Sequence, residues 1–307
     1  MNTTKLVPTY LTKKILRWSL CLSLLVFAWG CEDMHEKRKN IICFVDLSGS
    51  VGAENKQAYV NAIKLILRNM GTHDRLLVYP IDEGAYTNPV KIVYEDFMNS
   101  NATYGITFQN IPDSIKPPFT RKGDGITKKE EKRRKRIDRY VETIGPLIES
   151  RLDSIYNARS KYSSYSNILW ALLNCRDELE LVDREEAEAF SLESKILPYN
   201  YIIFLSDMIH EDKEYNFNRK RGVLEEDRND ILAGLLEKSR IPDLNGANVI
   251  ILGKGPGAKV TSEAAIDEIE KFWEIYFSRE YANARLYLYR GIDKIDEIPR
   301  FLAGWLE

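Results

Sequence analysis

Short apolar runs alternate along the chain with longer segments in which apolar residues recur every three or four positions. The short runs are residues 41–45, 76–79, 201–205, 249–252 and 286–289, and they consist mainly of aliphatic and aromatic residues. Such runs are typical of strands that are buried on both faces of a parallel sheet. Residues 90–94 predict one more strand. It comes soon after the turn signal of residues 82–84, so it could pair antiparallel with the 76–79 strand.

Five longer segments have the spacing of amphipathic helices: residues 53–70, 168–181, 224–236, 262–276 and 292–306. Thr261 or Ser262 can cap the fourth helix, and Pro299 fits the last helix only if it lies in the first turn. Strands that alternate with helices predict an α/β fold. We expect a doubly wound, Rossmann-like, mostly parallel six-stranded sheet with helices on both faces. Ligands bind such sheets beyond the carboxyl ends of the strands, where the strand order reverses.

Polar residues with metal-binding chemistry follow two predicted strands and precede one predicted helix. Asp46, Ser48 and Ser50 follow the first strand in an Asp-x-Ser-x-Ser pattern. Asp207 comes just after the 201–205 strand, and Ser166 lies just before the 168–181 helix. Carboxylate and hydroxyl oxygens are hard ligands that suit Mg²⁺, with Mn²⁺ or Ca²⁺ as alternatives. If the loop after the first strand is extended, its three polar side chains point the same way.

These segments resemble the von Willebrand factor type A (VWA) domain and its metal-ion-dependent adhesion site. Asp46, Ser48 and Ser50 match the first motif of the family, and Asp207 matches the third. Ser166 stands where the second motif usually has Thr. The resemblance implies that the three serines bind the cation directly or nearly so, and that the two aspartates act largely through water. It also implies an open coordination position, which an Asp or Glu carboxylate of a partner protein usually fills.

Simpler interpretations of the same residues stay open. The serine pair at positions 48 and 50 can cap the 53–70 helix. Ser163 and Ser164 are alternatives to Ser166 as the hydroxyl of the second motif.

The first thirty residues have the pattern of a secretory signal peptide. Residues 1–17 hold four basic and no acidic residues, and a mostly apolar stretch of 12 residues follows. That stretch is too short for a membrane-spanning helix of about 20 residues. Ala28, Gly30 and Cys31 resemble the lipobox of bacterial lipoproteins, which implies a lipid on Cys31 and a polar tether over residues 31–39. We therefore expect a bacterial cell-envelope protein, anchored by lipid to a membrane outside the cytoplasm. An ordinary signal peptide or an uncleaved anchor is the alternative.

Composition and charge exclude several classes of protein. The 307 residues are 44% hydrophobic and 29% charged, which argues against a wholly disordered, collagen-like or multi-span membrane protein. Loss of the four basic residues in 1–30 would change the net charge from −2 to −6. We therefore expect no nucleic-acid partner. Cys43 and Cys175 would remain in the VWA-like domain, and the apolar surroundings of Cys43 predict a buried thiol, with a disulfide as the alternative.

Residues 97–163 form an insertion in the VWA-like domain, which the resemblance extends over about residues 40–306. The run 128–136 within it contains seven basic and two acidic residues. It is either a contact for phosphates, acidic lipid or an acidic protein, or part of a solvated helix.

The pattern as a whole predicts a binding protein and not an enzyme. We expect it to be anchored to a membrane through lipid at Cys31 and to bind a protein carboxylate through one divalent cation. One alternative is a structural or accessory lipoprotein whose cation only stabilises loops. Another is a metal-dependent hydrolase that uses Asp207 and His210. Nucleophilic-Asp phosphatases have a second Asp where Ser48 stands, which argues against phosphoryl transfer.

Overall fold

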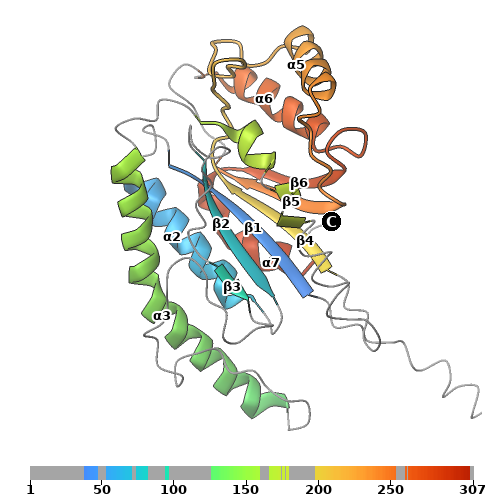
Figure 1. Ribbon diagram of the computed structural model, residues 1–307. Coiled ribbons are helices and arrows are strands. Elements are labelled where there is room, and N and C mark those ends of the chain that lie inside the picture. Colours follow the sequence, from blue (N-terminus) through green and yellow to red (C-terminus); the bar gives the residue numbers. More distant parts are fainter. Residues whose placement is uncertain are drawn as a thin grey trace, which may run out of the picture.

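Five parallel strands flanked by helices form the centre of the molecule in the computed structural model (Figure 1). The structure describes residues 38–47, 53–70, 74–81, 94–96, 126–159, 166–173, 175–176, 178–179, 198–253, 260 and 262–304. The parallel strands are β1 (Arg38–Asp46), β2 (Arg75–Ile81), β4 (Pro198–Leu205), β5 (Ala247–Leu252) and β6 (Ala284–Arg290). The short β3 (Tyr94–Asp96) pairs antiparallel with β2, and the order is β3-β2-β1-β4-β5-β6.

The five parallel strands lie where the apolar runs predicted them. The remaining prediction, a strand over residues 90–94, overlaps β3 only at Tyr94, since residues 90–93 lie outside the described residues. The antiparallel pairing of this segment with β2 is confirmed. The strand order reverses between β1 and β4, so the carboxyl ends of these two strands mark the place where a ligand is expected.

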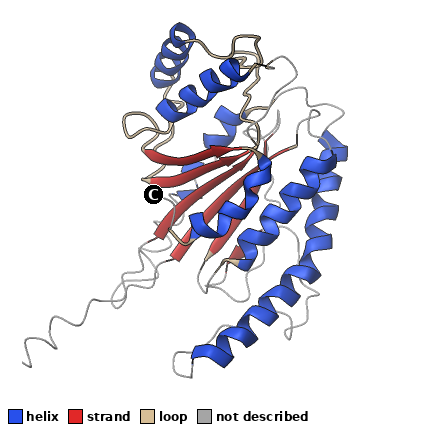
Figure 2. Ribbon diagram, turned by 180° about the vertical axis from the view of Figure 1, so that it is seen from behind, coloured by secondary structure: helices blue, strands red, loops and turns tan. Residues whose placement is uncertain are grey.

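Helices cover both faces of the sheet (Figures 1 and 2). On one face lie α2 (Ala53–Arg68) and α7 (Ile298–Leu302), and α3 (Ile126–Arg159) packs against α2. On the other face lie α5 (Glu225–Glu237), α6 (Glu263–Tyr276) and a helix that we call the Ile168 helix. The described helical residues of the Ile168 helix are 168–173, 175–176 and 178–179.

Each central strand contributes to two separate cores, which explains why its apolar run is unbroken. Ile41, Cys43 and Val45 of β1 pack on the α2 side, whereas Ile42 and Phe44 pack on the α6 side. Burial on both faces removes the polar alternation of a half-exposed strand.

The two cysteines of the described region are free, buried thiols. Cys43 belongs to the α2-side core and Cys175 to the α6-side core, so the sheet lies between them. Burial raises the pKa of both thiols. The buried thiol predicted at Cys43 is therefore confirmed, and the two thiols form no disulfide here.

Helix α3 lies inside the predicted insertion, and its second half is part of the fold. Tyr140, Ile144, Ile148 and Leu152 are buried in the α2-side core. The predicted basic run falls in the first half of α3, where Lys135 is exposed.

The expectation of one continuous helix over residues 292–306 was wrong. Residues Ile292–Glu297 form a 3-10 helix, η1, in which Lys294 leaves helical geometry, and α7 starts only at Ile298. Pro299 lies in the first turn of α7, where its missing N–H costs nothing, as the sequence required. Among the described residues, no helix is both long and apolar enough to cross a membrane.

Candidate metal site at the carboxyl edge of the sheet

A hydroxyl group joins the carboxyl ends of β1 and β4. Asp46 is the last residue of β1 and is 2% exposed, and its Oδ2 accepts a hydrogen bond of 3.1 Å from Ser206 Oγ. Ser206 directly follows β4, and its Oγ in turn accepts the N–H of Met208 at 3.0 Å. This chain of bonds fixes the orientation of the Asp46 carboxylate, because a buried carboxylate held by a hydroxyl has few alternative rotamers.

Asp207 begins a tightly held turn after β4. Its Oδ1 accepts the N–H of Ile209 at 2.9 Å, and its carbonyl oxygen accepts the Tyr289 hydroxyl of β6 at 3.0 Å. Met208 has φ 61°, and its carbonyl oxygen accepts the indole N–H of Trp273 on α6 at 2.9 Å. Two neighbouring elements thus hold a turn whose backbone is otherwise unfavourable for a side chain.

The two carboxylates act on each other electrostatically. Desolvation and the charge of Asp46 raise the pKa of Asp207 to about 7, while the N–H of Ile209 opposes this shift. Burial, with the charges of Asp46 and Asp207, also raises the pKa of the Tyr59 phenol on α2. Two carboxylates held in one place repel each other, and a proton or a cation relieves this repulsion.

The start of the Ile168 helix is tied to the same turn. The carbonyl oxygen of Ser166, a residue that is 9% exposed, accepts the N–H of Glu211 at 3.1 Å. His210 Nδ1 accepts the N–H groups of Ile168 at 3.1 Å and Leu169 at 3.4 Å. His210 therefore caps this helix, in the way that a side-chain oxygen usually does.

The capping hydrogen bonds indicate which nitrogen of the buried His210 ring carries the proton. Because Nδ1 accepts hydrogen bonds, the proton of the neutral ring is assigned to Nε2. Nε2 lies 3.3 Å from Asp212 Oδ2. Both ring nitrogens thus face groups of the protein, and the ring is fully buried. This arrangement speaks for a structural role and gives no support to His210 as a general base.

The structure brings three of the predicted ligands to one edge of the sheet: Asp46, Asp207 and Ser166. Ser48, Ser50 and the lipidation residue Cys31 lie outside the described residues. Within the described ranges, no group of three or more His, Cys, Asp or Glu side chains is arranged to hold a metal. The predicted set differs in kind, since it combines two carboxylates with serine hydroxyls. The described part fits a hard cation, because Asp46 is buried, Asp207 is partly buried, and hydrogen bonds orient both carboxylates.

Sequence reasoning missed two residues that build this edge. Ser206 occupies the register position after the pair Val45↔Leu205, directly opposite Asp46. Gly253 follows β5 with φ 153°, and a Cβ atom there would lie 2.3 Å from the carbonyl oxygen of Ser206. The sequence shows that Ser206 directly follows a buried strand, but it does not show that Ser206 is a partner of Asp46. Nothing in the sequence around Gly253 indicates that its backbone lies close to that of Ser206.

Comparison with known proteins gives weak structural similarity only. No protein-family model matches the chain, and no curated protein matches it. One similar solved structure is proximal thread matrix protein 1 from the mussel byssus, at 9% identity and TM-score 0.34, over 87% of this chain and 48% of that one. Another is the pilus adhesin SpaC from Lactobacillus rhamnosus GG in its open conformation, at 12% identity and TM-score 0.40, over 88% of this chain and 30% of that one. The matched part is less than half of either structure, and similarity at this level identifies no family.

Proposed function

We propose that this chain is a lipid-anchored VWA-type protein that binds a carboxylate of a partner protein through one divalent cation. The observation that carries the proposal is the pair Asp46 and Asp207. They are joined through Ser206 and its neighbours at the point where the strand order reverses. A cation bound between this pair of carboxylates and an outside ligand would explain why two acidic side chains lie at this point.

The donor chemistry favours Mg²⁺, with Mn²⁺ or Ca²⁺ as alternatives. Asp46, Ser166 and Asp207 would supply oxygen ligands directly or through water, together with Ser48 and Ser50. Carboxylates that act through water donate little charge, so the cation would keep affinity for an outside carboxylate. The rigid hydrogen bonds of Ser206 and Ile209 orient the two aspartates before the cation arrives, which lowers the entropic cost of binding.

A lipid on Cys31 would orient this site away from the membrane. The first residue of β1, Arg38, lies seven positions after Cys31, so the tether reaches at most about 25 Å. Asp46 lies at the other end of β1, which at about 3.3 Å per residue spans roughly 30 Å. The carboxyl edge would therefore face outward, where a partner protein is accessible.

Binding of matched peptides tests this function. Full-length protein in detergent would be captured on immobilised peptides that differ only by Asp/Glu against Asn/Gln. We expect capture on the acidic peptides in Mg²⁺, none in EDTA, and none with Asp207→Asn. Asp230→Asn, which changes an exposed carboxylate of α5, is the matched control and should bind like the wild type. Cation binding without any Mg²⁺-dependent capture would favour the accessory lipoprotein instead.

A further inference from the structure

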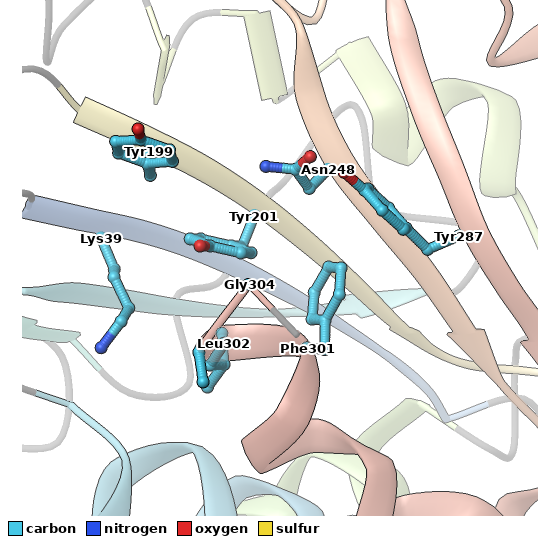
Figure 3. Close-up of a pocket in the computed structure, with 9 residues that line it drawn as sticks. Lys39, Tyr199, Tyr201, Asn248, Tyr287, Phe301, Leu302 and Gly304 are labelled. Carbon is cyan, nitrogen blue, oxygen red and sulfur yellow. The ribbon is translucent and has the colours of Figure 1, made fainter. Parts of the chain in front are cut away.

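A second candidate site lies at the opposite, amino edge of the sheet. A cavity of about 440 Å³ opens between the sheet and the end of α7 (Figure 3), a volume typical of small-ligand sites. Its described lining residues are Lys39, Tyr199, Tyr201, Asn248, Tyr287, Phe301, Leu302, Ala303 and Gly304.

The cavity lies beyond the end of the short helix α7. The helix ends at Leu302, and among the described residues the start of β4, the start of β5 and part of β6 line the cavity there. In this region aromatic side chains pack against one another. Phe301 makes edge-to-face contacts with Tyr201, at 5.2 Å between ring centroids, and with Tyr287, at 6.0 Å. Tyr201 is 6% exposed and Tyr199 is 37% exposed, so the aromatic floor runs from the core to the rim.

The charge of this cavity is compensated from within the protein. Lys39 is the single charged residue among the described lining residues, and its Nζ donates to Asn69 O at 3.0 Å and to Asp74 Oδ2 at 3.2 Å. An anionic ligand would have to compete with the Asp74 carboxylate. A cationic ligand would meet the Lys39 ammonium. The site therefore favours a neutral ligand.

The polar groups of the lining favour a ligand with several hydroxyl groups. Each tyrosine adds a phenolic hydroxyl to its ring. Asn248 Nδ2 donates one bond of 3.4 Å to Asn200 O, and an amide group has a second N–H and a carbonyl oxygen besides. Such a lining would leave polar groups unpaired against a purely apolar ligand, which is costly.

We propose that this cavity binds a neutral saccharide. A sugar ring presents an apolar face of C–H groups, which matches tyrosine rings, and a rim of hydroxyls, which matches amide and phenol groups. Tyr199 at the rim would stack on the sugar, and Asn248 in the floor would hydrogen-bond to its hydroxyls. The buried Tyr201 and Phe301 would mainly keep the floor in shape.

Saturation-transfer NMR on the full-length protein tests this proposal. The protein would be held in a detergent without a sugar headgroup and mixed with maltose, lactose, mannobiose and chitobiose in turn. We expect transfer to the C–H face of at least one of these, with binding weakened about tenfold in Tyr199→Ala and Asn248→Ala. Tyr199→Phe should restore most of the stacking. Tyr156→Ala on α3 is the control and should bind like the wild type.

The possible results separate this site from the cation site. Saccharide binding that survives EDTA and Asp207→Asn, and is lost in Tyr199→Ala, would support the proposal even if no partner carboxylate is ever bound. No transfer to any of the four disaccharides would overturn it. Transfer that is unchanged in both Tyr199→Ala and Asn248→Ala would overturn it as well.

Discussion

The two edges of this sheet carry opposite kinds of chemistry on the same strands. At the carboxyl edge, Asp46 and Asp207 hold two like charges beside each other, and hydrogen bonds from Ser206 and Ile209 orient them. At the amino edge, tyrosine rings and an amide line a cavity, and the charge of Lys39 is already paired. A cation would relieve the repulsion between the carboxylates at the carboxyl edge, whereas the charge of Lys39 at the amino edge already has a counterion in Asp74.

Because of this difference, the two edges should respond differently to changes in the solution. The carboxyl edge should respond to cations and protons, because both relieve the repulsion between its carboxylates. The amino edge should respond little to cations, because the charge of Lys39 is already paired with Asp74.

The largest effect should come from adding one methyl group at the carboxyl edge. Gly253→Ala would place a Cβ atom 2.3 Å from the backbone of Ser206, and we expect it to lower the free energy of unfolding by roughly 3 kcal/mol. Gly304→Ala at the amino edge is the matched control. It also has positive φ, but no atom lies within 4 Å of its Cβ position, so it should cost about 1 kcal/mol. Urea unfolding followed by circular dichroism measures both. Equal costs would contradict the close packing of Gly253 on Ser206.

Loss of the His210 cap should have the next largest effect. His210→Ala removes the side-chain acceptor of two N–H groups. Leu169 N–H loses it, and Ile168 N–H keeps only its bond of 3.0 Å to Ser166 O, so we expect a loss of roughly 2 kcal/mol in unfolding free energy. His210→Asn places an oxygen near the position of Nδ1 and should recover part of that loss. Turnover of a fluorogenic ester that disappears in both variants, with stability unchanged, would instead support the hydrolase alternative.

The pH dependence of stability should be smaller and should need EDTA to be seen. A carboxyl group whose pKa is raised on folding, such as Asp207, takes up a proton in the folded state. Its contribution is therefore present at low pH and is lost as pH rises from about 4 to about 7. Asp207→Asn removes that titration, so the variant should be more stable than wild type at pH 8, by roughly 1 to 2 kcal/mol, and similar at pH 5. Thermal melts at a series of pH values measure this. A wild type that gains stability relative to the variant as pH rises would contradict the charge repulsion.

Much of the fold could be predicted from the sequence because apolar runs report burial directly. The runs at 41–45 and 201–205 became β1 and β4, and their alternation with helices predicted parallel strands. The prediction of one helix over the final segment was wrong. The chain leaves helical geometry at Lys294 in η1, and Pro299 lies in the first turn of a separate helix, α7. The periodicity of apolar residues persists across such a break, so it cannot reveal where hydrogen bonding changes.

The candidate site could be predicted as a set of residue types, but its geometry could not. Asp46 and Asp207 were expected because each follows a buried strand. Ser206 was missed because its partnership with Asp46 depends on the register between strands 160 residues apart, which no local pattern encodes. His210 was recognised as polar, but its capping role depends on where the Ile168 helix begins relative to the turn after β4.

Titration of the full-length protein with Mg²⁺ and Mn²⁺ by calorimetry tests the central claim most directly. The matched variant is Asp46→Asn, which removes the charge but keeps an oxygen that can accept the Ser206 hydrogen bond. We expect saturable binding of one cation to the wild type, loss of that binding in Asp46→Asn, and unchanged binding in Asp230→Asn. Equal binding by the wild type and Asp46→Asn, in proteins with the same circular dichroism spectrum, would contradict a cation site at this edge.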